Sequence, residues 1–142
     1  MSYTRILIHA VWSTKDWKPL MTKNNKEALC AHIREYSLSK NIHLLNVNGW
    51  QNHLHAFLSL MPEQNIATVI NLIKGESSFW ANKNLRWTER FGWQNDYFAV
   101  SISQSHFERV NNYISNQEEH HRKKTFQEEY AEFIKNYHFE QG

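Results

Sequence analysis

Residues 41–60 read NIHLLNVNGWQNHLHAFLSL and hold two apolar segments that an Asn-Gly pair separates. Asn-Gly is a preferred turn sequence between neighbouring strands. The stretch therefore predicts one strand over residues 41–50 and another over residues 53–60, which ends before Pro62. This pair of adjacent strands indicates a protein built on a β-sheet and shows where its central hairpin lies.

Strands and helices alternate on both sides of this hairpin. A β-branched and aromatic run predicts a strand at 3–12, and residues 97–103 predict a fourth strand. The spacing of apolar residues predicts a helix at 23–40, with Thr22 as its cap, and another at 65–84. The order β-α-β-β-α-β predicts an α+β fold with a ferredoxin-like antiparallel sheet.

Two more helices are expected after the fourth strand. Ser105 with Glu108, and Thr125 with Glu128, are each spaced as a capping box, the pattern that marks a helix start. The second of these helices has an apolar face formed by Phe126, Tyr130, Phe133, Ile134 and Tyr137. We expect residues 1–142 to form a single domain that ends in these helices.

The composition is that of a folded protein and excludes several classes of protein. Hydrophobic residues make up 41% of the sequence, which argues against disorder. Cys30 is the single cysteine, so an internal disulfide and a cysteine-based zinc site are excluded. No apolar run approaches the length of a membrane span, and the first residues do not resemble a signal peptide. We therefore expect a cytoplasmic protein without a membrane partner. The net charge of +2 neither demands nor excludes a nucleic-acid partner.

Two histidines stand one residue apart in the strand predicted at 53–60. Because alternate residues of a strand share a face, His53, His55 and Phe57 point one way and the leucines point into the core. The two imidazoles would be about 7 Å apart at their β-carbons and could converge on one ion or phosphate. An ordinary strand face with two histidines fits the pattern equally well. Phe57 stands where a histidine-triad hydrolase would have a third histidine, and two histidines leave a zinc site incomplete.

A tyrosine and a glutamine on the first C-terminal helix could complete such a site. Tyr113 and Gln117 are four residues apart and would stack on one side of the helix, at the edge of its apolar stripe. A divalent cation would help a tyrosine hydroxyl to attack a phosphate by polarising and orienting that phosphate. With two imidazoles, the side-chain oxygen of Gln117 suits Mg²⁺ or Mn²⁺ better than a structural zinc ion. Taken alone, such a pair more commonly means a packed tyrosine and a solvated glutamine.

In combination these residues resemble the single-tyrosine HUH transposases, which move bacterial insertion sequences as single-stranded DNA, and the related REP-associated tyrosine transposases. The resemblance rests on HLH at 53–55, followed by YISNQEEHH at 113–121. Three further stretches are similar to that family: VWSTKDWKPLMT at 11–22, LIKGESSFW at 72–80 and WQNDYFAVSISQS at 93–105. The resemblance spans the chain from about Tyr3 to Glu129.

The resemblance implies a role for each residue of this set. His53 and His55 would bind a divalent metal, Mg²⁺ or Mn²⁺, and Gln117 would complete its protein ligands. Tyr113 would attack a DNA phosphate, form a 5′-phosphotyrosine link and release a 3′-hydroxyl, so the C-terminal helices would carry the nucleophile. Family members typically act as homodimers, with the tyrosine helix of one copy serving the other in trans, and they recognise DNA hairpins near the element ends. Many relatives have an acidic residue where this chain has Asn52, which bears on how the metal site is tuned.

Basic and aromatic residues cluster where single-stranded DNA could lie. Lysines and arginines could contact phosphates, and exposed tryptophans could stack on unpaired bases. The clusters comprise Lys15, Trp17, Lys18, Lys74, Lys83, Arg86, Trp87, Arg90, Arg122, Lys123 and Lys124. An alternative function is a DNA-hairpin binding protein that descends from such a transposase and no longer moves DNA. A ferredoxin-like RNA-binding module is a third reading, but it leaves the histidines, tyrosine and glutamine unexplained.

Overall fold

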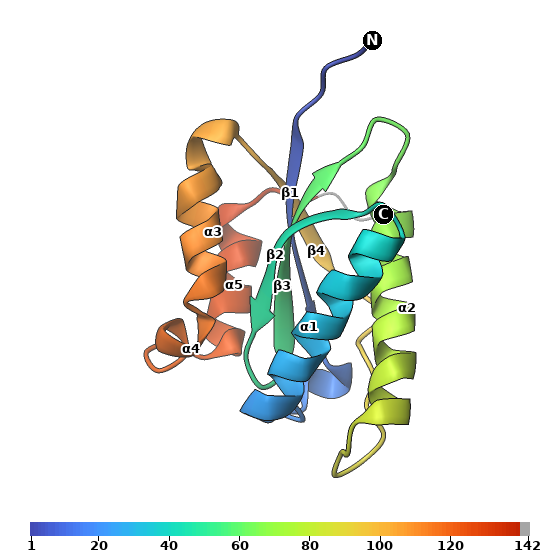
Figure 1. The fold of residues 1–142 in the computed structure, drawn as a ribbon. Coiled ribbons are helices and arrows are strands. Elements are labelled where there is room, and N and C mark those ends of the chain that lie inside the picture. Colours follow the sequence, from blue (N-terminus) through green and yellow to red (C-terminus); the bar gives the residue numbers. More distant parts are fainter. Residues whose placement is uncertain (140–142) are drawn as a thin grey trace.

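The computed structural model describes residues 1–139, and its elements follow the predicted order (Figure 1). The strands are β1 (Ile6–Ser13), β2 (His43–Gly49), β3 (His53–Leu60) and β4 (Phe98–Ile102). The α-helices are α1 (Lys23–Ser39), α2 (Ile66–Asn84), α3 (Phe107–Ser115), α4 (Gln117–His120) and α5 (Phe126–Asn136). Within the described residues, none of the helices combines the length and the apolar content that crossing a membrane requires.

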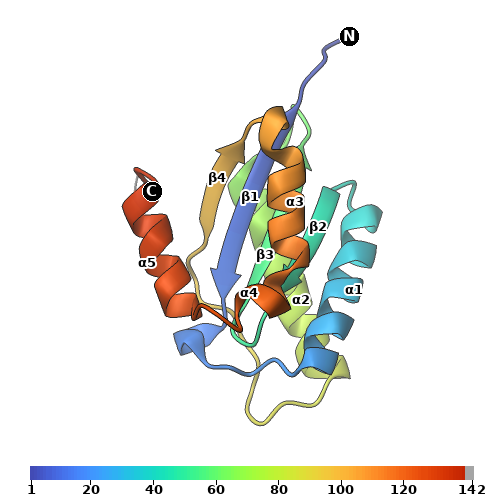
Figure 2. The same ribbon diagram turned by 90° about the vertical axis from the view of Figure 1, so that its left-hand side faces the viewer.

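The strands form one sheet in the order β2-β3-β1-β4, and each neighbouring pair is antiparallel. This arrangement confirms the predicted ferredoxin-like α+β fold. Helices α1 and α2 cover one face of the sheet, whereas α3 and α5 lie on the other (Figures 1 and 2). Because β3 lies between β2 and β1, the two histidines of β3 stand in the middle of the sheet.

The main hydrophobic core lies between the sheet and the layer formed by α1 and α2. Leu54, Ala56 and Leu58 of β3 belong to it and are buried. Ile33 of α1 and Ile70 of α2 are part of the same core. Full burial of an aliphatic side chain of this kind contributes about 1.5–3 kcal/mol to folding. The alternation read from the sequence of β3 is therefore confirmed, with its leucines in the core.

A smaller apolar cluster holds α3 against the opposite face of the sheet. Phe57 of β3 packs there with Leu7 and Ile114. Asn48 of β2 adds polar contacts, since its side-chain amide donates to the carbonyl oxygens of Ile114 at 3.0 Å and Ser115 at 3.2 Å. The last carbonyls of a helix have no partner inside the helix, so these bonds fix the C-terminal end of α3 on the sheet. The position of α3 decides where Tyr113 lies.

The turn between β2 and β3 lies slightly later than the Asn-Gly pair predicts. The backbone N–H of Trp50 donates to the carbonyl oxygen of His53 at 3.1 Å, and Gly49 is the last residue of β2. A β-carbon on Gly49 would stand 2.0 Å from the carbonyl oxygen of His53. The glycine is therefore required by the close approach of two backbone segments rather than by a left-handed turn conformation.

Of the three predicted helix caps, two are confirmed and one is wrong. The side chain of Thr22 caps α1, and Thr125 forms the expected capping box with Glu128 at the start of α5. Helix α3 instead begins at Phe107, directly after a 3₁₀ turn at Gln104–His106. Ser105 lies inside that turn, whereas a capping residue needs extended backbone, so its hydroxyl does not cap α3.

The first strand is shorter than the sequence predicts. β1 begins at Ile6, which pairs with Leu60, the last residue of β3. Residues 3–5 therefore have no strand opposite them, and Tyr3 is exposed. The β-forming composition of residues 3–5 is not sufficient to make a strand where no hydrogen-bonding partner is available.

Candidate functional site

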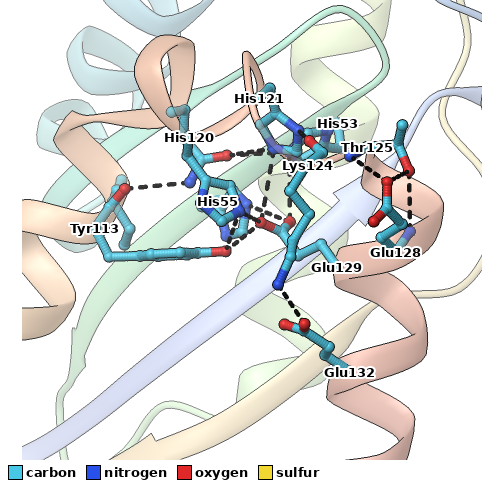
Figure 3. A network of polar contacts seen from close by, with 12 residues as sticks. His53, His55, Tyr113, His120, His121, Lys124, Thr125, Glu128, Glu129 and Glu132 are labelled. Carbon is cyan, nitrogen blue, oxygen red and sulfur yellow. Dashed lines mark hydrogen bonds and ion pairs between the residues drawn. The ribbon is translucent and has the colours of Figure 1, made fainter.

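His53 and His55 lie side by side on the sheet face that α3 and α5 cover, as the strand period predicts (Figure 3). Both side chains are fully buried. The ring of Phe126 from α5 stacks on the His53 ring with 4.0 Å between centroids. Burial and the neighbouring His55 hold the pKa of His53 well below its usual range, so the His53 imidazole is neutral. The histidine pair thus belongs to a buried, covered site and not to an exposed strand face.

A hydrogen bond at Nδ1 orients each of these imidazoles. The Nδ1 of His53 donates to Oδ1 of Asn52 at 2.9 Å. The Nδ1 of His55 lies 2.8 Å from Nε2 of His9 on β1. Burial, together with the nearby His55, lowers the pKa of His9 to about 3, so His9 is also neutral. With each Nδ1 engaged, the Nε2 atoms of His53 and His55 face the centre of the site, toward Gln117 and Glu129.

Gln117 is fully buried against this pair. Its Oε1 lies 3.1 Å from Nε2 of His53 and 3.1 Å from Nε2 of His121, and its Nε2 donates to the carbonyl oxygen of Tyr113 at 3.2 Å. The prediction of one continuous helix through Tyr113 and Gln117 is wrong, because α3 ends at Ser115 and α4 begins at Gln117. The residue between the two helices has φ −102° and ψ 29°, outside the α-helical region.

Tyr113 reaches from α3 toward the histidine pair (Figure 3). Its ring centroid lies 5.5 Å from that of His55. Its hydroxyl donates to Oε2 of Glu129 and lies 3.4 Å from Nε2 of His120. Burial and the negative charge of Glu129 raise the pKa of the Tyr113 hydroxyl well above its usual value, so the hydroxyl is protonated. One chain therefore brings together both predicted histidines, the tyrosine and the glutamine.

Glu129 of α5 is buried at the centre of the same cluster, and the sequence prediction did not include it. Its Oε1 lies 3.1 Å from Nε2 of His55 and 3.6 Å from Nε2 of His53. Its Oε2 lies 2.8 Å from Nε2 of His120. Burial alone would raise the pKa of Glu129, but the hydrogen bond and attraction of His55 hold it below its usual range. Glu129 is therefore ionised at neutral pH.

Each site residue absent from the prediction nevertheless had a signal in the sequence. Glu129 is a carboxylate within the apolar face of the last helix, and a charge in such a face usually has a buried partner. His120 and His121 follow Gln117 within three and four residues. His9 interrupts the apolar run of the first strand. None of these signals identifies the residue that the side chain contacts, because the contacts join segments far apart in the chain.

The donor atoms of the cluster fit a divalent metal ion. His53, His55 and Glu129 each offer one ligand atom, and these atoms lie within 4.8 Å of one another. His120, His121 and Glu129 form a second group with the same property. Imidazole nitrogens combined with carboxylate and amide oxygens suit divalent ions such as Mn²⁺, and the oxygen ligands also suit Mg²⁺. The residues present thus match the predicted cofactor class.

The residues predicted to contact DNA differ in their surroundings. Lys123 lines a hollow of about 470 Å³ together with Tyr113 and His120. Exposed side chains belong also to Lys15, Lys18, Arg86, Arg90 and Arg122. Lys74, in contrast, is only 7% exposed, and its ammonium donates to the backbone carbonyls of residues 94–96 at 2.6, 3.1 and 3.2 Å. Lys74 therefore holds a loop in place and has no spare donor for a phosphate.

Aromatic side chains surround a second hollow, of about 510 Å³, beside the histidine cluster. Trp17, Phe98, Phe126 and Tyr130 are among the residues that line it. The Trp17 ring centroid lies 4.7 Å from that of Tyr130 and 5.1 Å from that of Phe126. An aromatic surface of this kind can stack on unpaired bases. Trp87 is placed differently, since it packs against the main core and its Nε1 donates to a backbone carbonyl of α2.

Solved structures of other proteins share the fold of this chain. A candidate transposase from Deinococcus radiodurans has a TM-score of 0.66 and 18% sequence identity, over 82% of this chain and 93% of that chain. A REP-associated tyrosine transposase bound to a REP hairpin has a TM-score of 0.63 and 11% identity, over 85% of this chain and 72% of that chain. No curated protein matches the chain. The family described as "Transposase IS200 like" matches residues 2–117, so the chain belongs to the IS200-like transposases.

Proposed function

We propose that this transposase cleaves and rejoins single-stranded DNA with Tyr113 as the nucleophile and a divalent metal bound by His53, His55 and Gln117. The observation that carries the proposal is the convergence of these side chains, from β3, α3 and α4, in one covered cluster. Burying several polar side chains together is costly unless they serve one another or a ligand. A protein that only binds DNA on its surface has no need of such a cluster.

The proposed metal would be Mg²⁺ or Mn²⁺. When bound, it would polarise the target phosphate and help to orient that phosphate for in-line attack. The Nε2 atoms of His53 and His55 would bind the ion, because Asn52 and His9 engage the two Nδ1 atoms and direct each Nε2 toward the centre of the site. Gln117 would add a neutral oxygen ligand next to His53.

Tyr113 would carry out the cleavage step. Its Oη would form a bond to phosphorus, the bond from phosphorus to the 3′-oxygen would break, and the proton of the tyrosine hydroxyl would pass to the released 3′-oxygen. The products are a 5′-phosphotyrosine ester and a free 3′-hydroxyl. The phosphotyrosine ester conserves the energy of the cleaved phosphodiester bond. A 3′-hydroxyl can therefore attack this ester in a later step and rejoin the DNA without ATP. Glu129 and His120 contact the hydroxyl that must lose its proton.

The DNA would approach Tyr113 through the hollow lined by Lys123 and His120. Exposed basic residues around the site would contact phosphates, and Trp17 would offer a stacking surface beside it. A structure with the same fold is bound to a REP hairpin, which supports a hairpin near the element ends as the DNA partner here. We expect this reaction in the cytoplasm.

A homodimer in which the tyrosine helix of one copy serves the other stays a prediction from the family resemblance. In the structure, Tyr113 and Gln117 lie against His53 and His55 of their own chain. A trans arrangement would require α3 and α4 to exchange between two copies. The two arrangements differ in whether inactive variants can complement one another.

The proposal is tested by incubating the purified protein with Mn²⁺ or Mg²⁺ and 3′-labelled single-stranded DNA from the flanks of its gene. We expect an adduct that survives denaturing electrophoresis with the native protein and none with Tyr113→Phe, which keeps the ring. Tyr130→Phe is the matched control and should retain the adduct, since Tyr130 lines the neighbouring hollow and phenylalanine keeps its aromatic ring there. Hairpin binding without any adduct would favour the DNA-binding protein instead. An unchanged adduct in Tyr113→Phe would remove Tyr113 from this role.

A further inference from the structure

Glu129 lies at the centre of the site but outside the residues that the family match covers, which end at 117. Helix α5 delivers this side chain, and the capping box of Thr125 and Glu128 fixes the first turn of that helix. A capped first turn limits the freedom of the residues that follow directly. A role of Glu129 at the metal depends on the metal site proposed for His53, His55 and Gln117.

The spacing of the donor atoms around Glu129 is close to the edge lengths of a single coordination shell. Ligands about 2.1 Å from an ion stand about 3.0 Å apart in an octahedron and about 3.4 Å apart in a tetrahedron. The Oε1 of Glu129 lies 3.1 Å from Nε2 of His55 and 3.6 Å from Nε2 of His53. The Oε1 of Gln117 lies 3.1 Å from Nε2 of His53. The two distances of 3.1 Å agree with octahedral edges and the distance of 3.6 Å is slightly longer, so Glu129 Oε1 stands close to the place of a further ligand of the same ion.

The charge of the site points to the same atom. Two imidazoles and the amide of Gln117 form a neutral ligand set, and a divalent cation in a buried site is costly without a negative partner. Mg²⁺ and Mn²⁺ prefer carboxylate oxygens over neutral nitrogen ligands. In the part of the chain that the structure describes, both groups of candidate metal ligands contain Glu129.

We propose that Glu129 is the anionic ligand of the metal centre and binds the ion through Oε1. Its other oxygen, Oε2, accepts the hydrogen bond of the Tyr113 hydroxyl and lies 2.8 Å from Nε2 of His120. The Glu129 carboxylate lies between His55 and the Tyr113 hydroxyl (Figure 3). The same carboxylate would thus hold the nucleophile next to the ion. Helix α5 becomes a part of the active site, and metal binding ties this helix to the sheet.

The test is a titration of the full chain with Mn²⁺, in which the electron paramagnetic resonance signal of the free ion gives the affinity. We expect Glu129→Gln to weaken Mn²⁺ binding by about tenfold or more. Glu128→Gln is the matched control and should bind as the native protein does, because Glu128 is exposed and glutamine can still close the capping box. Loss of a carboxylate should weaken Mn²⁺ more than Ni²⁺, which imidazole suits, whereas a merely structural defect should weaken both alike.

The possible results distinguish an error in the role of Glu129 from an error in the proposed metal site as a whole. Native Mn²⁺ affinity in Glu129→Gln, with affinity lost in His55→Ala, would overturn the role of Glu129 and leave the histidine site in place. A native protein that binds no Mn²⁺ would overturn the proposed metal site as a whole. If circular dichroism shows that Glu129→Gln does not fold, Glu129→Asp decides the matter. That variant keeps the charge but withdraws the oxygens by one methylene, so unchanged affinity would contradict direct binding.

Discussion

His53 depends for its orientation on Asn52, the residue directly before it. The side-chain oxygen of Asn52 accepts from Nδ1 of His53 at 2.9 Å, which directs Nε2 toward the centre of the site. Loss of a partner of this kind typically costs about 10–100-fold in metal affinity. We therefore expect Asn52→Ala to weaken Mn²⁺ binding by about tenfold or more, as measured by titration.

The control at this position is Asn52→Asp. Aspartate keeps the acceptor oxygen and is the kind of residue that the family resemblance predicts there, so its Mn²⁺ affinity should equal or exceed that of the native protein. Equal affinity in Asn52→Ala and the native protein would mean that Asn52 does not orient His53.

The orientation of His53 and His55 toward one face could be predicted because a strand has a period of two residues. Their partners could not be predicted in the same way. His9 lies on another strand and Glu129 lies on the last helix, so both contacts depend on how distant segments meet. The sequence shows a histidine in an apolar strand and a glutamate in an apolar helix face, and both are unusual. The periodicity does not identify the residue that each of these side chains contacts.

Two lysines that look alike in the sequence should behave in opposite ways. Lys74 donates to three backbone carbonyls, so Lys74→Gln should lower the free energy of unfolding by about 1–3 kcal/mol and leave DNA binding of the folded protein unchanged. Lys123 is exposed beside Tyr113, so Lys123→Gln should leave stability within about 0.5 kcal/mol of the native value. Urea unfolding measures the first effect.

Fluorescence anisotropy with labelled single-stranded DNA, over a range of salt concentrations, measures the second effect. Removing one phosphate contact should reduce the slope of log affinity against log salt by about 0.7 in Lys123→Gln. A change of slope in Lys74→Gln, or none in Lys123→Gln, would contradict the roles assigned to these two lysines.

At the scale of elements, two glycines provide a matched test of the hairpin and of α2. A β-carbon on Gly49 would stand 2.0 Å from the carbonyl oxygen of His53, so Gly49→Ala must displace backbone and should cost about 1–3 kcal/mol. Gly75 lies within α2 with no atom within 4 Å of an added β-carbon, so Gly75→Ala should stabilise the protein by about 0.5–1 kcal/mol. Both values follow from urea unfolding; a neutral Gly49→Ala would disprove the close approach at the hairpin.

Helices and strands whose bounds are set by neighbouring residues were predicted correctly, whereas bounds that depend on distant contacts were not. The bounds of β3 agree with the prediction because its alternation and the following proline are local signals. The start of α3 was wrong because the backbone of Ser105 is part of a 3₁₀ turn, although its spacing from Glu108 matches a capping box. The break before Gln117 left no mark in the apolar pattern, since it occurs where the chain turns from α3 into α4 over the histidines.

For the whole molecule, the order of elements was sufficient to predict the ferredoxin-like sheet, because few topologies accommodate βαββαβ. The position of α5 was not predictable from that order. Its aromatic face identifies it as a docked helix, but the sheet face that it covers is decided by contacts such as Phe126 on His53. The candidate site was therefore predicted without the helix that supplies its carboxylate.

Complementation tests whether the site is completed within one molecule. His55→Ala lacks a metal ligand and Tyr113→Phe lacks the nucleophile, so each variant alone should form no DNA adduct. Because Tyr113 lies against His55 of its own chain, the geometry predicts that a mixture of the two variants also forms none. Restored adduct formation in the mixture would instead support the homodimer with the tyrosine helix in trans.

The most direct test of the central claim is to identify the residue that carries the DNA. After reaction with single-stranded DNA and Mn²⁺, nuclease and trypsin digestion should leave a nucleotide on the peptide VNNYISNQEEHHR, residues 110–122, whose single tyrosine is Tyr113. Mass spectrometry should find this peptide modified and the peptide TFQEEYAEFIK, residues 125–135, which contains Tyr130, unmodified. A nucleotide on the second peptide, or strand cleavage with no modified tyrosine, would contradict Tyr113 as the nucleophile.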